Sequence, residues 1–219
     1  MEQNLLTQHI VNKEVLKAQL KALVELDQRL VPIFDQVGEV PLRLGKPGFA
    51  GLAPIVSGQL LSVASARAIH TRVETLVGEM SAKKFLAVET EALRAAGLSW
   101  SKIHCLCGVA QAELSGTIDF EALHLMNVSE AVEKLTAVKG IGPWSAQIYL
   151  MSSVAHPDIF PAGDLVLQKM LGKILGKTKK PDEKQTSKLA KKWSPYRGAA
   201  ARLLWRYFAV LRDREGINL

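Results

Sequence analysis

The sequence predicts an all-α protein of about ten helices joined by short loops. Apolar residues recur at helical spacing along most of the chain, and capping residues, glycines and prolines separate these stretches. We find no convincing alternation of apolar and polar residues that would indicate strands, and no internal repeat. The chain has 219 residues, 48% of them apolar, which fits one compact unit or two closely packed subdomains with ample material for a core.

The first predicted helix follows Asn12, a capping residue, and leucines at spacings of four and three residues give it an apolar face. Pro32 marks its exit. Residues 38–51 are rich in glycine and proline, and we expect them to connect this helix to two helical stretches over 55–61 and 65–77.

Capping and stop signals divide the middle of the chain. Ser81, Thr90 and Ser129 are expected N-caps, and Gly97 is expected to end a helix. The helices expected here cover residues 101–114, 119–125 and 130–137.

The last part of the chain is expected to form a glycine turn at 140–142 and a series of helices. Their expected ranges are about 143–154, 164–175, 181–192 and 194–212. Ser194 and Pro195 start the final helix, as an N-cap and a proline at the first helical position.

The positive charge is concentrated in one segment. The chain carries 28 basic and 21 acidic residues, a net charge of +7, and residues 169–206 hold 12 of the basic residues and only two acids. The remainder of the chain is therefore slightly negative. A basic segment on a nearly neutral body indicates a polyanionic partner, and a solvated surface is the alternative that charge alone leaves open.

Cysteine usage and hydropathy exclude several classes of protein. Cys105 and Cys107 are too few for a disulfide framework and lack the spacing of a zinc or iron–sulfur site, so we interpret them as reduced thiols of an intracellular protein. The first ten residues lack the apolar core of a signal peptide. The uncharged stretches 47–66 and 140–157 contain glycine, proline, serine and glutamine, which favours buried helices over membrane spans.

A glycine turn between two helices is the strongest functional pattern. Residues 135–139 end one helix, G-I-G follows at 140–142, and Pro143 opens the next helix. Glycines allow positive φ and a close approach to a ligand, and the second helix presents unpaired N–H groups that suit a phosphate. For this motif taken alone, a purely structural turn between helices is the alternative.

Two further motifs follow in order. In F-P-A-G-D, which ends at Asp164, a single carboxylate opens an apolar helix, and in isolation it fits an N-cap. The segment W-S-P-Y-R-G-A-A over 193–200 then leads into an aromatic helix. Together with I-V-S-G-Q-L-L-S-V-A over 55–64, these motifs resemble those of the helix–hairpin–helix DNA glycosylase superfamily, most nearly 3-methyladenine DNA glycosylase II. The resemblance covers about residues 49–212, and four ordered motifs are far more specific than any one of them.

The resemblance implies a two-lobed helical fold with the active site in the interlobe cleft. Residues 1–219 would form a single glycosylase domain, with lobe A over about 50–136, lobe B over about 1–45 and 155–219, and the hairpin 135–151 at the junction. Because fewer than fifty residues precede the first motif, we expect a compact form without the additional N-terminal β-rich subdomain of the relative.

The resemblance also assigns roles to residues. Asp164 would be the catalytic carboxylate, and Leu60 the minor-groove wedge that fills the gap left by a flipped base, with core packing as the alternative for Leu60. The DNA backbone would bind the main chain of the hairpin, with a Na⁺ or K⁺ ion as a possible bridge. The hairpin residues concerned are Lys139, Gly140, Ile141, Gly142 and Ser145.

Alkylation makes a purine cationic, so an electron-rich pocket would select it by cation–π attraction. The candidate pocket aromatics are Trp205, Trp144, Tyr149 and Tyr207. Trp205 matches a pocket position of the family, whereas core packing is the stronger interpretation of each of the others. Asp164 would stabilise the oxocarbenium-like sugar and orient the attacking water.

Two departures from the patterns of the family limit the chemistry. Bifunctional relatives use a lysine shortly after the second hairpin glycine, and Trp144 stands at that position here, so simple hydrolysis without lyase activity is expected. Two cysteines cannot build the iron–sulfur cluster of several relatives, and we expect no structural metal.

The predicted function is therefore that of a monofunctional DNA glycosylase of base-excision repair. It would flip alkylated purines such as 3-methyladenine and 7-methylguanine out of duplex DNA and hydrolyse the N-glycosidic bond, with the basic segment following the DNA backbone. A glycosylase of the same fold for deaminated or oxidised bases and a non-catalytic DNA-binding protein are the alternatives. We expect a monomer without membrane association, located in the cytoplasm with the nucleoid or in the nucleus.

Overall fold

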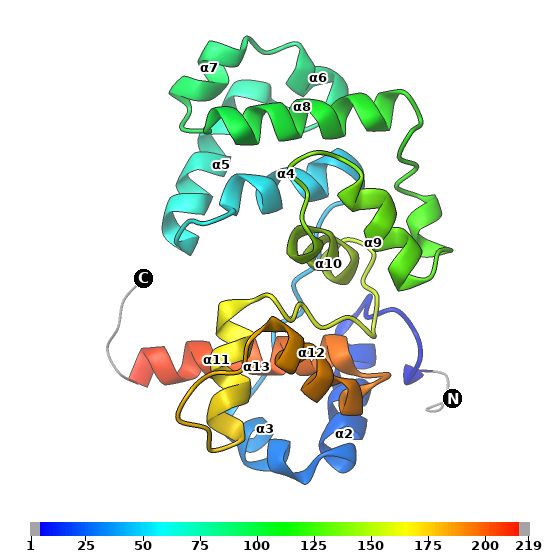
Figure 1. Ribbon diagram of the computed structural model, residues 1–219, viewed down its shortest axis with the longest axis vertical. Helices are drawn as coiled ribbons and strands as arrows, with labels where there is room; N and C mark the ends of the chain where they lie inside the picture. The colour runs from blue at the N-terminus through cyan, green and yellow to red at the C-terminus, as the bar shows by residue number, and fades with distance from the viewer. Residues whose placement is uncertain (1–4, 215–219) are drawn as a thin grey trace. The chain divides into compact units, whose positions relative to one another are not determined.

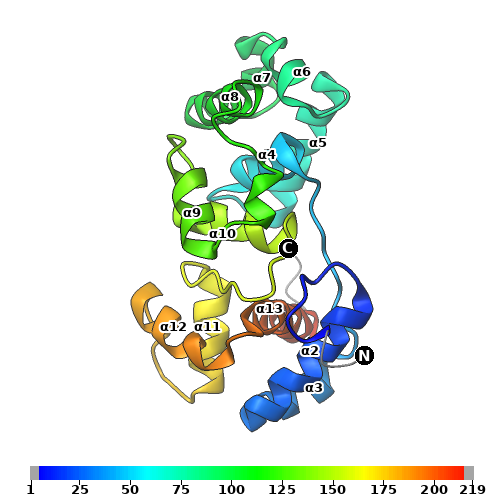
Figure 2. The ribbon, with the colours of Figure 1, turned by 90° about the vertical axis from the view of Figure 1, so that its right-hand side faces the viewer.

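The computed structural model describes residues 5–214. Helices joined by loops and turns make up this part of the chain, with no strand among them, so the predicted all-α class is confirmed. The chain divides into two compact units (Figures 1 and 2). Among the described residues, unit 1 combines residues 5–44 with residues 155–214, and unit 2 is the continuous stretch 45–154. The hairpin over 135–151 therefore lies within unit 2.

Unit 2 is a helical bundle with an apolar core. Its helices are α4 (Gly48–Gly58), α5 (Val63–Val77), α6 (Ala82–Leu86), α7 (Thr90–Ala95), α8 (Trp100–Leu114), α9 (Val128–Thr136) and α10 (Pro143–Ser152), with a short 3₁₀ turn at Ala122–His124. Helix α8 packs against α4, α6 and α7, and α10 packs against α4 and α9. Phe49 and Phe85 meet in this core with ring centroids 5.1 Å apart. Helix α10, which follows the glycine turn, is thus held from two sides.

Unit 1 is built around the last helix. Its helices are α2 (Lys13–Leu26), α3 (Val31–Val37), α11 (Leu165–Ile174), α12 (Glu183–Ala190) and α13 (Arg197–Arg214), with 3₁₀ turns at Gln28–Leu30 and Lys191–Trp193. Helix α13 contacts α2, α3 and α11, so elements from both ends of the chain share one core (Figure 1). The buried indole of Trp193 donates a hydrogen bond to Asp27, 2.8 Å away, across 166 residues of sequence.

Several predicted caps are confirmed. The side chain of Asn12 accepts a hydrogen bond from the Val15 N–H at 2.9 Å, and Ser81 caps α6. Asp164 caps α11 by accepting from the Leu167 N–H at 3.0 Å. Gly97 ends a helical segment with φ +109°, a backbone angle that residues with a Cβ rarely adopt. At these positions a short polar side chain or a glycine acts on its own neighbours, and the sequence therefore predicts the local structure.

Helix α4 differs from the prediction. It begins at Gly48, inside the stretch expected to be a connection, and Pro54 lies within it. A proline inside a helix removes one backbone hydrogen bond and costs about 3 kcal/mol. Phe49 and Leu52 are 1% and 0% exposed, and burial of two such side chains offsets that cost, at about 1.5–3 kcal/mol each.

Other boundaries are shifted from their predicted positions. Asn127, not Ser129, caps α9, and Thr90 is the first residue of α7 rather than its cap. Pro32 does not end helical structure but lies in the first turn of α3. Ser194 is the C-cap of the 3₁₀ turn Lys191–Trp193 and not the N-cap of the final helix: its hydroxyl donates to Asp158 at 2.7 Å, and α13 begins three residues later.

Helices α4 and α10 lie in the two uncharged stretches of the sequence. Within residues 5–214, no helix combines the length and the apolar character that crossing a bilayer requires.

Candidate functional site

The hairpin is a tight turn that only glycine can make. The backbone of Gly140 has φ +97°, and a Cβ atom there would lie 2.8 Å from the Cβ of Cys105 on α8. The Ile141 N–H donates to the carbonyl of Val138 at 3.0 Å, and the Ile141 side chain is buried. The turn therefore lies directly on α8, and burial in this position raises the pKa of the Cys105 thiol to about 11.

The start of α10 is open to a ligand. The N-cap of α10 is Gly142, which has no side chain to cap the helix, and Pro143 lies in the first turn of α10. Lys139, Gly140 and Pro143 are exposed, so the exposed backbone of the hairpin lies next to the positive end of the helix dipole. This arrangement suits a phosphate group, as the sequence predicted.

Ser145 and Trp144 follow in the first turn of α10. Ser145 is only 2% exposed, and its hydroxyl accepts a hydrogen bond from the side chain of Gln59 at 2.9 Å. A direct contact of the Ser145 side chain with DNA does not fit this burial, because its hydroxyl faces Gln59. Trp144 is half-buried.

Leu60 is fully exposed. It lies in the turn between α4 and α5 with φ +60°, and its relative exposure is 105%. The core-packing alternative for this residue is therefore wrong. An apolar side chain held out in water at this position fits the wedge hypothesis.

Asp164 and Trp205 come together in unit 1. The Trp205 indole N–H on α13 donates to Asp164 Oδ1 at 3.3 Å, and the same oxygen accepts from the Leu167 N–H. Both side chains are half-buried. The structure therefore places the predicted catalytic carboxylate in contact with the favoured pocket aromatic, and packing of α11 on α13 fixes the pair.

Tyr149 is not a pocket residue. It is 1% exposed in the core of unit 2, packs against Phe120 with ring centroids 5.3 Å apart, and its hydroxyl accepts from the Gly48 N–H at 2.9 Å. This burial raises the pKa of Tyr149. The base-pocket assignment is corrected on this point, because the side chain joins α10 to the start of α4 and is enclosed.

Tyr207 lies two residues beyond Trp205 on α13 and is half-buried. At 3.6 residues per turn, the two side chains project about 200° apart around the helix axis. They therefore leave the helix on different faces, which separates Tyr207 from the face that contacts Asp164.

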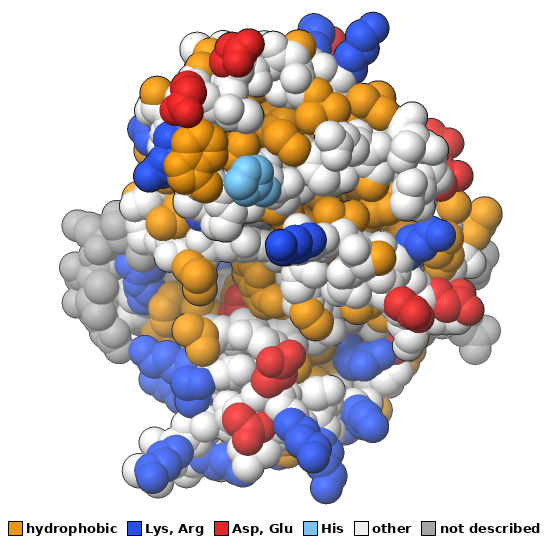
Figure 3. Space-filling view, turned by 45° about the horizontal axis from the view of Figure 1, so that its top comes forward, with side chains coloured by type: hydrophobic (Ala, Val, Ile, Leu, Met, Phe, Trp, Pro, Cys, Tyr) orange, Lys and Arg blue, Asp and Glu red, His pale blue; other side chains and the backbone are white. Residues whose placement is uncertain are grey.

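The basic segment contains two kinds of cation. Its three arginines are structural: Arg197 pairs with Asp158 at 2.6 Å, Arg206 donates to the Val37 carbonyl at 3.0 Å, and Arg202 is 5% exposed. Burial lowers the pKa of Arg202 to about 10. The lysines of the segment are exposed, and Figure 3 shows Lys and Arg side chains projecting from the lower half of the face that it draws.

No group of three or more His, Cys, Asp and Glu side chains is arranged to hold a metal ion in the part of the chain that the structure describes. The Na⁺ or K⁺ ion suggested by the sequence analysis would instead bind main-chain groups of the hairpin.

A family model described as "HhH-GPD superfamily base excision DNA repair protein" matches residues 53–195. The chain belongs to the HhH-GPD superfamily. This confirms the assignment that the hairpin and its accompanying motifs predicted. The matched residues include the turn that carries Leu60, the hairpin and Asp164.

The named relatives agree with this assignment. The chain is 31% identical over 166 residues to DNA-3-methyladenine glycosylase 1 of Schizosaccharomyces pombe, covering 74% of this chain and 72% of the relative. A solved structure of S. pombe 3-methyladenine DNA glycosylase (Mag1) in complex with abasic DNA matches with a TM-score of 0.79 at 28% identity, covering 85% of this chain and 95% of that chain. A crystal structure of a DNA-3-methyladenine glycosidase from Bacillus halodurans matches with a TM-score of 0.75 at 33% identity, covering 95% of this chain and 94% of that chain.

Proposed function

We propose that this HhH-GPD protein is a monofunctional DNA glycosylase that hydrolyses the N-glycosidic bond of alkylated purines in duplex DNA. The observation that carries the proposal is the contact between Asp164 and Trp205, which joins a carboxylate to an electron-rich ring. The relatives named as 3-methyladenine glycosylases support the same substrate class, with 3-methyladenine and 7-methylguanine as the expected bases.

The carboxylate supplies the central electrostatic step. Cleavage of the bond between sugar and base leaves positive charge on the sugar, and a carboxylate close to C1′ stabilises that charge. Asp164 is held for this task by two donors, the Leu167 N–H and the Trp205 indole N–H. The same carboxylate can orient or deprotonate the attacking water.

The leaving group requires little help. A purine alkylated at N3 or N7 carries a positive charge and departs as a neutral base, so no dedicated general acid is needed. The Trp205 ring would attract that positive charge before cleavage by about 0.5–2 kcal/mol. Because its N–H is bonded to Asp164, the ring is fixed beside the carboxylate that acts on the same nucleotide.

Hydrolysis is the complete reaction that we propose. A lyase reaction requires an amine to form a Schiff base with the sugar, and Trp144 stands where bifunctional relatives carry the lysine. The product is then a free base and an intact strand with an abasic site.

DNA is held by main-chain groups of the hairpin and by the exposed lysines of the segment 169–192. The backbone around Gly140 and the open start of α10 would bind phosphate, and a Na⁺ or K⁺ ion on the hairpin carbonyls would add to that binding. We propose that the protein acts on duplex DNA as a monomer, since flipping one nucleotide requires one active site. Its place of action would be the nucleoid or the nucleus.

Base release tests the proposal directly. Wild-type protein and Asp164→Asn are incubated with duplex DNA treated with a methylating agent, and the freed bases are separated by chromatography. Asparagine is as good an N-cap as aspartate, so the variant keeps α11 and loses only the charge. We expect the wild type to release 3-methyladenine and the variant to release at least a hundredfold less, as for the loss of a major transition-state interaction.

Two outcomes would contradict the proposal. If the wild type binds DNA but releases no alkylpurine, another lesion class or a binding role replaces it. If Asp164→Asn retains full activity, the carboxylate is not the catalytic group.

A further inference from the structure

The turn that carries Leu60 is held in an unfavourable conformation. Leu60 has φ +60°, a left-handed backbone angle that leucine rarely adopts, and its side chain gains no burial in return. Such a conformation persists only where neighbouring contacts determine it. The residues on either side of Leu60 must therefore supply those contacts.

Gln59 supplies the first set. Its side-chain amide donates to the hydroxyl of Ser145 at 2.9 Å and to the carbonyl of Gly140 at 3.3 Å. Gly140 lies in the hairpin turn and Ser145 in the first turn of α10, so one amide group contacts both the turn and the helix that follows it. Both acceptors are more than 80 residues away in sequence but belong to the same unit.

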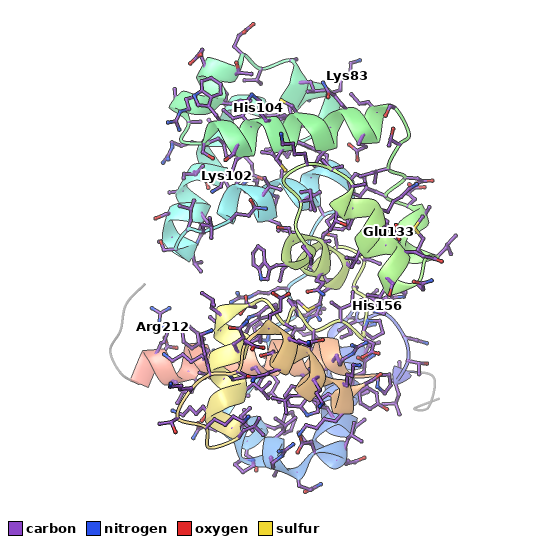
Figure 4. All side chains as sticks on the ribbon, in the orientation of Figure 1. Lys83, Lys102, His104, Glu133, His156 and Arg212 are labelled. Atoms are coloured by element: carbon purple, nitrogen blue, oxygen red, sulfur yellow. The ribbon has the colours of Figure 1, made fainter. Side chains whose placement is uncertain are left out.

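Lys102 on α8 supplies a second contact. Its ammonium group donates to the carbonyl of Ser57 at 2.8 Å, at the end of α4, and burial lowers the pKa of Lys102. Figure 4 labels Lys102 between α8 and α4. The end of α4 is thus fixed to α8, and Gln59 fixes the next residue to the hairpin.

We propose that Gln59 is a positioning residue that sets the place of Leu60 relative to the DNA-binding hairpin. The inference rests on the proposed function, in which the hairpin holds the DNA backbone and Leu60 enters the base stack. Both N–H groups of the Gln59 amide are engaged with the hairpin, which favours a role through Leu60 over a role as a donor to DNA. A wedge already held in place when the backbone binds avoids the cost of ordering the turn during base flipping.

The test uses Gln59→Leu, which keeps a side chain of similar length and removes both donors. Affinity is measured for an intact duplex and for a duplex with a tetrahydrofuran abasic analogue, whose gap Leu60 can fill. Single-turnover release of 7-methylguanine is measured in parallel. We expect the preference for the gapped duplex and the release rate each to fall about tenfold, as for a small misplacement of a reacting group. Affinity for intact duplex should stay within about twofold of the wild type, because the hairpin main chain remains.

Leu60→Ala and the double variant decide how Gln59 acts. If Gln59 works by positioning Leu60, Gln59→Leu adds no further loss in the Leu60→Ala background. Additive losses in the double variant would overturn the proposal. So would a Gln59→Leu variant that loses intact-duplex affinity as much as gapped-duplex affinity, because that result would assign Gln59 to the hairpin alone.

Two further variants control for folding. Gln28→Leu removes an exposed glutamine in unit 1 whose amide also donates to two carbonyls, and it should change neither measurement. If Gln59→Leu fails to fold, Ser145→Ala removes one of the two acceptors and should give a smaller loss of gap preference in the same direction. No loss in Ser145→Ala would then overturn the proposal.

The outcome also separates this inference from the proposed function. Release of alkylpurine by wild type and Gln59→Leu at equal rates would leave the function intact and refute the positioning role. If the wild type releases no alkylpurine, the function fails, and the gap preference alone judges Gln59: its loss in Gln59→Leu supports the role, and its retention refutes it.

Discussion

The indole of Trp205 combines two contributions in one side chain. Its N–H holds Asp164, and its ring attracts a cationic base. Trp205→Phe removes a hydrogen bond worth about 1 kcal/mol and weakens a cation–π attraction by about 0.5 kcal/mol. Since 1.4 kcal/mol is tenfold in rate, we expect single-turnover release of 7-methylguanine to fall about tenfold. Binding to abasic-analogue DNA should not change, because no base then occupies the pocket; an unchanged release rate would remove Trp205 from the site.

At the residue scale, the sequence predicts what local contacts determine. Taken in isolation, the motif around Asp164 predicts an N-cap, because a carboxylate before an apolar helix bonds to the N–H of its own third neighbour, and Asp164 makes this bond. Tyr149 and Gln59 could not be assigned in this way, because their partners lie 101 and more than 80 residues away. Only packing of α10 on α4 brings those groups together. Gln59 belongs to the motif over 55–64, but the sequence alone does not show that its side chain contacts the hairpin.

The hairpin turn depends on one glycine for its shape. Gly140→Ala would strain a backbone at φ +97° and place a methyl group 2.8 Å from the Cys105 Cβ, so α8 and the turn must separate. We expect at least a tenfold loss of affinity for intact duplex, measured by fluorescence anisotropy. Gly116→Ala is the matched control: Gly116 has φ +71° with no atom near its absent Cβ, so this variant carries similar backbone strain without the clash. Both should lose roughly 1–2 kcal/mol of stability from strain, but only Gly140→Ala should lose DNA. Equal affinities in the two variants would contradict the assigned role of the hairpin.

At the element scale, most helices were predicted, but several boundaries were not. Helix α3 was not predicted, and the helix expected over 119–125 is only a 3₁₀ turn at Ala122–His124. Helix α10 follows from the G-I-G-P pattern, since glycine and proline determine backbone angles directly. Helix α4 was placed too late because Pro54 and the glycines before it are local signals against a helix. Burial of Phe49 and Leu52 outweighs those signals, and the sequence alone does not show how complete that burial is.

The whole molecule should bind DNA through its lysines and keep its fold through its arginines. The exposed Lys173, Lys177 and Lys179 are available to phosphates, whereas Lys192 is paired with Asp27 and Arg197 with Asp158. Each phosphate neutralised contributes about −0.9 to the slope of log affinity against log salt. We therefore expect a slope of several negative units for intact duplex. A variant with Lys173, Lys177 and Lys179 changed to Gln should have a shallower slope by up to about three units, with an unchanged melting temperature.

Arg197→Gln should instead lower the melting temperature, because it leaves Asp158 without its paired charge, and should leave the slope nearly unchanged. A flat salt response in the wild type would show that the basic segment is a solvated surface.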